Sequence, residues 1–345
     1  MGRSKPRRWA APWALAASRA AAFAAVLLAA SPAAAAEDHA LVALPADVMQ
    51  FLGIYAASDE GFWAREGLNV KTVFIAGVGS FNAVVAGSAE FSVSSGVALT
   101  RAAAHGQRML AIANMLDKPV WSIVIATDIA AKAEIGPDAP LAERARLMAG
   151  RRMGIDAVSS VVHAYLRVIA RAGGLQPDSI VVAPLQPQET LAAFARGALD
   201  GFVGGPPWPQ LAETHYGAVP IASPLTGDPP WIAPNGSGVI VTRPQFCAEH
   251  RPVCVKMGRG LAAGAKFIHD EPAEALALLK KRFPNTPDPV LAAVFAAVQA
   301  GTPVPPVMAK EVLENSERLN IEAGFLAPGD RLKSYDGLFT DEFVR

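Results

Sequence analysis

The chain has 345 residues, of which 52% are hydrophobic and 18% are charged, and its formal net charge is zero. This length favours about two globular domains with buried cores. The first 36 residues hold five basic residues and no acid, and subtracting five from 31 leaves 26 basic against 31 acidic residues, a net charge of −5. A mildly acidic remainder excludes the basic footprint that a nucleic-acid-binding protein would need.

Residues 1–36 have the pattern of a secretory signal peptide. Arg3, Lys5, Arg7 and Arg8 precede an apolar stretch at 20–30, and small residues lead up to Glu37. That stretch is shorter than the ~20 residues that cross a bilayer, which disfavours a membrane anchor. We therefore expect cleavage near Ala36 and a mature protein in the periplasm. The arginine pair leaves the choice between general and twin-arginine export open.

From residue 39 onward, short apolar strands alternate with helices, which predicts parallel βαβ units. The predicted strands are 39–45, 69–75, 89–95 and 108–115, and the predicted helices are 49–65, 79–86 and 97–104.

The pattern restarts after Pro119. We expect strands at 120–127, 151–156, 178–185, 199–205 and 237–242, and helices at 141–148, 160–171 and 188–196. The remainder is predicted to be helical, at 244–250, 252–269, 272–283, 288–299 and 308–322.

The expected fold is α/β, with two lobes joined by a two-strand hinge and followed by C-terminal helices. Residues 37–118 and 243–345 would form lobe 1, and residues 119–242 would form lobe 2. The similar strands 120–127 and 237–242 are expected to be the two crossovers, lying side by side as antiparallel ribbons. Paired connections would let the lobes close over a ligand.

The two cysteines, Cys247 and Cys254, lie in the segment FCAEHRPVC. On one unbroken helix their Cα atoms would be ~10 Å apart, beyond the ~7 Å bridging limit. Pro252 should break the helix, and the resulting bend would allow a disulfide in an oxidising compartment. A metal site that also uses His250 is the alternative, but it lacks a fourth ligand and the usual spacing.

Ligands of open α/β sheets collect beyond the carboxyl ends of strands, where helix N-termini point. Four segments fit that place: AGVGSF, SSGVA, DAVSSVVH and GGPPWP. Polar residues after the first strand and at the first crossover add to them. The predicted ligand-binding residues are Asp47, Gln50, Gly79, Ser80, Ser94, Ser95, Gly96, Trp121, Ser159, Ser160, His163, Gly205 and Trp208.

Each of these residues also has a structural interpretation. A serine at a helix start usually only caps the helix, a histidine on an apolar face is usually buried, and a tryptophan between prolines can simply pack. The chain contains no GxSxG, HExxH, GxxxxGK[ST] or GxGxxG motif, so no catalytic residue, cofactor or metal is predicted.

The segment LGIYAASDEGFWAREGLNVKTVFIAG resembles the start of exported substrate-binding proteins of the nitrate/sulfonate/taurine type, including the NMT1/THI5-like binders. Matching segments follow in order: VVAGSAEFSVSSGVAL, LMAGRRMGIDAVSSVVHAYLRVIARAGGLQPDSI, TLAAFARGALDGFVGGPPW and the helices from His250. The resemblance implies a periplasmic binding protein type II-like fold and a monomer that delivers a small solute to an ABC permease and its ATPase. Contact with the membrane would be peripheral, through that transporter.

By this resemblance, Ser94, Ser95, Ser159, Ser160 and His163 would contact the solute. The segments lack the arginine expected for an inorganic or sulfonate anion, and PPW, Met49 and Phe51 suit a partly apolar organic solute. Sulfonate, pyrimidine or thiamine-precursor, and aromatic solutes all remain open. A thiamine-pyrimidine synthase-like enzyme of the same fold and a sensing protein for a separate receptor are the alternative functions.

Overall fold

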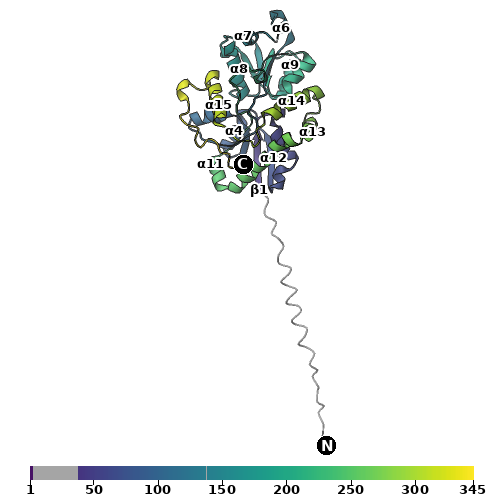
Figure 1. The fold of residues 1–345 in the computed structure, drawn as a ribbon, viewed down its shortest axis with the longest axis vertical. Helices are drawn as coiled ribbons and strands as arrows, with labels where there is room; N and C mark the ends of the chain where they lie inside the picture. Colours follow the sequence, from purple (N-terminus) through teal and green to yellow (C-terminus); the bar gives the residue numbers. More distant parts are fainter. Residues whose placement is uncertain (3–37, 137) are drawn as a thin grey trace. The chain divides into compact units, whose positions relative to one another are not determined.

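The computed structural model describes residues 1–2, 38–136 and 138–345. The predicted signal peptide, its cleavage near Ala36 and the choice of export route therefore lie outside the described residues. Asp38–Arg345 forms one compact unit, which contains two five-stranded sheets (Figure 1). Each sheet with its covering helices is called a lobe below.

The first sheet has the strand order β2-β1-β3-β10-β4. Its strands are β1 (Asp38–Leu44), β2 (Leu68–Phe74), β3 (Phe91–Ser94), β4 (Leu110–Asn114) and β10 (Val239–Thr242). The first three are parallel, and β10 runs antiparallel to both of its neighbours. Helices α4 (Val78–Val85) and α5 (Gly96–Ala104) connect successive strands, as the alternating pattern predicted.

The prediction of one unbroken helix at 49–65 is wrong. The chain forms η1 (Met49–Phe51), α2 (Leu52–Asp59) and α3 (Phe62–Arg65). The break falls at Gly61, whose φ of 69° lies in the left-handed region that glycine tolerates. This break lets Trp63 turn inward, where it is 2% exposed and donates its indole N–H to the Met257 carbonyl.

The second sheet has the order β7-β6-β8-β5-β9. Its strands are β5 (Ser122–Ile125), β6 (Arg152–Ile155), β7 (Val181–Pro184), β8 (Gly201–Gly204) and β9 (Val219–Ala222). Its helices are α6 (Thr127–Ala133), α7 (Leu141–Arg146), α8 (Val161–Ala172), α9 (Pro187–Ala195) and α10 (Trp208–Tyr216), with η2 (Pro177–Ser179) and η3 (Pro224–Thr226). Sequence analysis did not predict α6, α10 or β9.

The expectation that strands 120–127 and 237–242 lie side by side is wrong. Both strands were predicted as crossovers within residues 119–242, the expected second lobe. In the structure β5 belongs to the second sheet and β10 to the first. The chain instead crosses between the lobes just before each strand. Those crossing segments are paired, because Met115 N–H donates to the Gly238 carbonyl and Ser237 N–H to the Leu116 carbonyl, at 2.8 and 3.1 Å.

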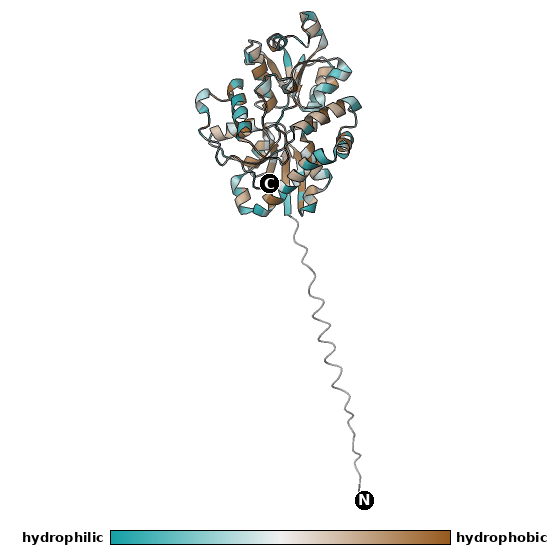
Figure 2. Cartoon of the chain, viewed as in Figure 1, coloured by the Kyte–Doolittle hydropathy of each residue, from teal (hydrophilic) through white to brown (hydrophobic). Residues whose placement is uncertain are grey.

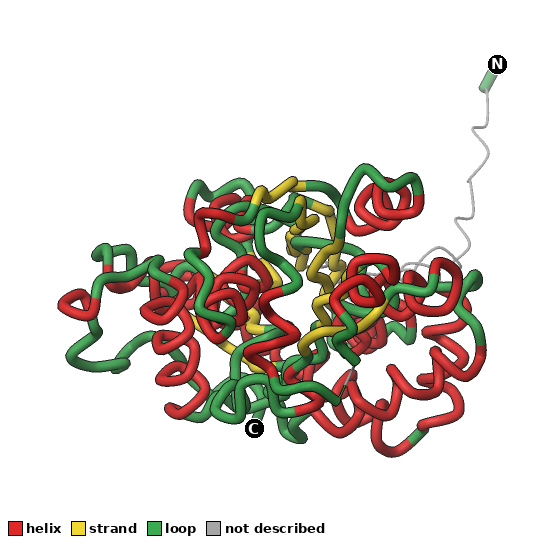
Figure 3. The backbone as a smooth tube through the Cα atoms, turned by 90° about the horizontal axis from the view of Figure 1, so that it is seen from above, coloured by secondary structure: helices red, strands yellow, loops and turns green. Residues whose placement is uncertain are grey.

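The remaining helices are α11 (Pro244–Glu249), α12 (Arg251–Asp270), α13 (Pro272–Arg282), α14 (Asp288–Gly301), α15 (Lys310–Ala323) and η4 (Pro328–Asp330). Helix α15 contributes to both lobes: Val312 and Leu313 pack in a cluster of the first lobe, and Leu319 and Ala323 pack with Trp121 in the second. Apolar strands lie inside a shell of helices with more polar outer faces (Figures 2 and 3).

Cys247 and Cys254 form a disulfide, with their Cα atoms 5.7 Å apart. Helix α11 ends at Glu249 and α12 begins at Arg251, so the chain bends between the two cysteines. Both residues are buried, and the bond holds the start of α12 against α11. Because both sulfurs are bonded to each other, neither supplies a thiolate for the alternative metal site with His250.

Among the described residues, no helix combines the length and the apolar character that crossing a bilayer requires.

Candidate functional site

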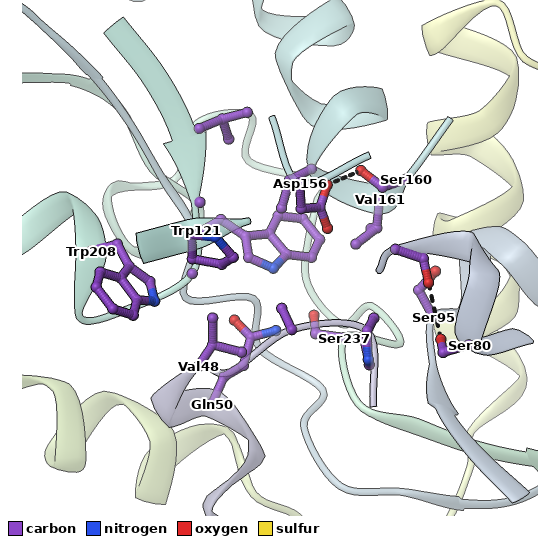
Figure 4. Close-up of a pocket in the computed structure, with 18 of the residues that line it drawn as sticks. Val48, Gln50, Ser80, Ser95, Trp121, Asp156, Ser160, Val161, Trp208 and Ser237 are labelled. Carbon is purple, nitrogen blue, oxygen red and sulfur yellow. Dashed lines mark hydrogen bonds between the residues drawn. The ribbon is translucent and has the colours of Figure 1, made fainter. Parts of the chain in front are cut away.

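A pocket lies between the two lobes, with a volume of ≈ 790 Å³ including its open mouth. Its walls come from the segments that follow β1, β2 and β3 in the first sheet and β6, β7 and β8 in the second. The carboxyl ends of the parallel strands in both sheets therefore point into one space, as expected for open α/β sheets. Figure 4 shows side chains from both lobes around it.

Most of the residues predicted from the sequence come together there. The predicted residues that line the pocket are Gln50, Ser80, Ser94, Ser95, Trp121, Ser160, Gly205 and Trp208. The predicted residues that do not line it are Asp47, Gly79, Gly96, Ser159 and His163. Lining residues that the sequence did not single out are Val48, Asp156, Thr190, Phe202 and Ser237, and Phe51, which the sequence named only as suiting an apolar solute, also lines the pocket.

Local packing explains why some of the predicted residues lie elsewhere. Gly96 lies beneath α15, since a Cβ atom there would fall 2.2 Å from Ser316 Oγ. Asp47 lines a neighbouring cavity and accepts the Tyr55 hydroxyl at 3.0 Å. Ser159 takes a left-handed φ of 63° and donates its N–H to His163 Nδ1 at 2.9 Å.

The first-lobe wall is built on the start of helix α5. Ser95 caps this helix, because its Oγ accepts the N–H of Ala98 at 3.2 Å. The hydroxyl of Ser80 is occupied within the lobe, where it bonds the carbonyls of Gly77 and Val93. These serines thus satisfy backbone groups as well as lining the pocket.

The second-lobe wall is built on the start of helix α8. Ser160 caps this helix by accepting the His163 N–H at 3.2 Å, and its hydroxyl donates to Asp156 Oδ1 (Figure 4). The N–H of Ala157 donates to the same Oδ1 at 2.7 Å. The Oδ2 atom has no hydrogen-bond partner among the described residues.

Asp156 is the only ionisable residue among the described residues that line the pocket. Burial raises the pKa of its carboxyl group, and the hydrogen bonds from Ser160 and Ala157 oppose that rise only in part. A carboxylate of perturbed pKa in a cleft is a functional-site signal. Its position directly after β6 could have revealed it, because the aspartate ends the predicted strand 151–156.

Three residues that line the pocket each carry a buried polar atom without a partner among the described residues. These atoms are Gln50 Oε1, Trp121 Nε1 and Ser237 Oγ, on side chains that are 7%, 0% and 3% exposed. Buried polar groups are normally hydrogen-bonded, so these three atoms are free to bond a water molecule or a ligand in the pocket. Ser237 belongs to one of the two paired crossing segments, and Trp121 follows the other in the chain.

One rim of the pocket is closed by direct bonds between the lobes. The indole N–H of Trp208 donates to the Asp47 carbonyl at 3.0 Å, and the N–H of Met49 donates to the Pro206 carbonyl at 2.8 Å. Gly205 lies so close that a Cβ atom there would be 2.5 Å from Gln50 Oε1. On the far side of Trp208 lies the neighbouring cavity that Asp47 also lines.

At a second place the methyl group of Ala157 in the second lobe packs against the backbone of Gly77 in the first. A Cβ atom on Gly77 would fall 2.2 Å from the Cβ of Ala157. Gly77 has φ 50° and ψ −125°, a conformation that side-chain-bearing residues avoid. The pocket is thus held between two places where the lobes touch.

His163 does not line the pocket, and its protonation affects the stability of the folded protein. Its ring contacts Phe325 with centroids 5.2 Å apart, and burial first, then Arg167 and Arg101, lower the pKa of His163 from 6.5 to about 4. The unfolded chain therefore binds the proton more tightly. Stability should be complete above pH 6.5 and fall as the pH drops toward 4, by at most about 3 kcal/mol and less after solvent screening.

We expect His163→Asn, whose amide oxygen can replace Nδ1 as the acceptor for Ser159, to flatten this pH dependence. Urea unfolding between pH 7.5 and 4 would measure it. His215→Asn, on the exposed end of α10, is the matched control and should leave the slope unchanged. An equal slope in the His163 variant and the unmodified protein would contradict the assignment.

A family model described as "NMT1/THI5 like" matches residues 48–275. No curated protein matches the chain. The match spans both lobes and all of the pocket-lining residues except those at its N-terminal edge, Pro45 and Ala46.

Solved structures of the same fold cover most of the chain. A protein from Bordetella bronchiseptica RB50 is 16% identical, with a TM-score of 0.74 over 89% of this chain and 95% of that one. The alkanesulfonate-binding protein SsuA from Xanthomonas axonopodis pv. citri, bound to MOPS, is 17% identical, with a TM-score of 0.67 over 87% and 97%. The periplasmic nitrate-binding protein NrtA from Synechocystis PCC 6803 is 15% identical, with a TM-score of 0.66 over 88% and 86%.

Proposed function

Because the chain belongs to the NMT1/THI5-like family, we propose that it is the solute-binding component of an ABC-type importer. One observation carries this proposal: a pocket with polar atoms that lack partners is enclosed between two lobes of the chain. Solved structures that share the fold include sulfonate-binding and nitrate-binding proteins.

The solute would be a small organic molecule held between the two places where the lobes touch. The walls support this choice, since they combine apolar residues such as Phe51, Phe202 and Val48 with a few polar atoms. Small-molecule sites usually have this composition. The paired crossing segments near Met115 and Gly238 would act as the hinge, and α15, which packs on both lobes, would limit how far they open.

The proposed partners are an ABC permease and its ATPase, which would receive the solute from a monomeric, periplasmic protein after residues 1–36 are removed. The export-type N-terminus and the fold shared with periplasmic binding proteins support this placement. The pocket offers no thiol for the synthase-like alternative, because both cysteines are joined on α11 and α12.

A thermal-shift screen of sulfonates, nitrate, pyrimidines, ureas and aromatic acids, followed by calorimetry, tests this function. We expect a hit to lose about tenfold in affinity on Trp208→Ala, which removes an aromatic wall and the bond to Asp47. A similar loss is expected for Ser160→Ala, which frees the carboxylate of Asp156 from one of its donors.

Trp231→Ala is the matched control, because Trp231 packs beside Arg318 outside the pocket. It should leave the affinity within about twofold. Unchanged affinity in both pocket variants would show that the solute binds elsewhere. Chemical conversion of the solute would instead support an enzyme.

A further inference from the structure

The carboxylate of Asp156 has no cationic partner. Its two hydrogen bonds both reach Oδ1, from the Ser160 hydroxyl and the Ala157 N–H, and Oδ2 is left without a partner among the described residues. The pKa of this group is raised chiefly by burial, and no charged side chain contributes to the shift. Asp156 is half-buried at the wall of the pocket, and a carboxylate in a cleft without a cationic partner is a functional-site signal.

The same carboxylate changes what the start of helix α8 can bind. A free helix N-terminus attracts anions, through its unpaired N–H groups and its dipole. Here Asp156 lies at that end, and Ser160 already caps the helix by accepting the His163 N–H. A bound anion would therefore meet a negative charge in place of an open row of N–H groups.

Three buried polar atoms on other pocket-lining residues also lack partners among the described residues and add to the groups available to a ligand. Trp121 Nε1 is a donor only, Gln50 Oε1 is an acceptor only, and Ser237 Oγ can be either. With Asp156 Oδ2 as a second acceptor, the pocket calls for at least two donors and one acceptor on the ligand. All four groups line one pocket and come from both lobes (Figure 4).

Resting on the proposed function, we infer that the solute is neutral or cationic, with an amine-, amidine- or amide-type N–H for Asp156 and an acceptor for Trp121. The ionised form of the same carboxylate would repel anionic solutes, including sulfonates and nitrate, and weaken their binding. Asp156 is therefore the residue that selects the solute by charge.

Calorimetry with probes that share one ring tests this assignment. The probes are benzamidine as the cation, benzamide as the neutral donor, and benzoate and benzenesulfonate as the anions. At pH 7.5 we expect benzamidine and benzamide to bind at least about tenfold more tightly than benzoate and benzenesulfonate. The first two can donate a hydrogen bond to the Asp156 carboxylate, whereas the two anions are repelled by its charge.

The variant Asp156→Asn keeps the shape and an oxygen acceptor for Ser160 and Ala157 but removes the charge. It should weaken benzamidine by about 10- to 100-fold and change benzamide by only a few-fold, so that the preference over benzoate nearly disappears. Asp178→Asn, on an exposed acid outside the pocket, should leave all four affinities unchanged. A thermal melt of each variant checks that it is folded.

Anion binding as tight as benzamidine binding, or an unchanged preference in Asp156→Asn, would overturn the inference. If that anion binding also required Trp208, the proposed function would stand and only the charge assignment would fail. Binding by none of these probes would overturn the inference, and a failure of the wider solute screen as well would count against the proposed function.

Discussion

The variant Gly77→Ala is expected to weaken solute binding by about 10- to 100-fold while leaving the protein folded. The added methyl group would lie 2.2 Å from the Cβ of Ala157 in the other lobe, so the lobes could not come together there. The backbone of Gly77, at φ 50° and ψ −125°, adds strain for any side chain. Calorimetry with a screen hit, combined with small-angle scattering, would measure both the affinity and the closure.

Two controls separate the collision from the strain. Adding Ala157→Gly to Gly77→Ala removes the overlap of the methyl groups and should restore most of the affinity. Gly61→Ala places alanine in the left-handed region, at φ 69° and ψ 27°, with no atom within 4 Å, so it reports the milder strain of a left-handed alanine without a collision and should bind normally. Full affinity in Gly77→Ala would mean that this contact between the lobes is not needed for binding.

The largest loss of stability is expected from Arg144→Met in the second lobe. Arg144 forms a two-point ion pair with Asp228, at 3.1 and 3.3 Å, and the two side chains are 14% and 10% exposed. Among the described residues, removing the arginine leaves the buried carboxylate of Asp228 with only the Thr226 hydroxyl as a side-chain donor. Breaking such a pair costs about 3 to 5 kcal/mol, and urea unfolding at pH 7 would measure the loss.

Lys132→Met is the matched control, since it breaks an ion pair with Asp128 in which both side chains are well exposed, at 77% and 65%. Its effect should stay below about 1 kcal/mol. Equal losses in the two variants would show that burial does not set the value of the Arg144–Asp228 pair.

Sequence patterns were most reliable where one element carries its own signal. Strand β1 and the helix starts at Ser95 and Ser160 were predicted within one or two residues, since apolar runs and serine caps are local features. Strand β9 and helix α10 were missed. Prolines at Pro220 and near Trp208 argue against regular structure, yet both elements are stabilised by packing in the second lobe.

For the site, position along the chain was a better guide than residue chemistry. The predicted segments do meet in one pocket, because each follows a parallel strand. His163 lies one turn into its helix and points toward Phe325 instead, and which way it faces depends on packing. Asp156 begins the predicted segment DAVSSVVH, but the serines and the histidine of that segment were chosen because a single aspartate forms no recognised motif.

The amino-acid sequence by itself indicated the alternation of strands and helices, the two-lobed plan and the family, and it predicts an export-type N-terminus. These depend on composition and on spacing between near neighbours, which any window of the chain contains. Only the tertiary structure decided that β10 joins the first sheet, that α15 packs on both lobes and that Gly77 meets Ala157. Such contacts join residues far apart in the chain, and they form because the whole molecule buries its apolar surface at once.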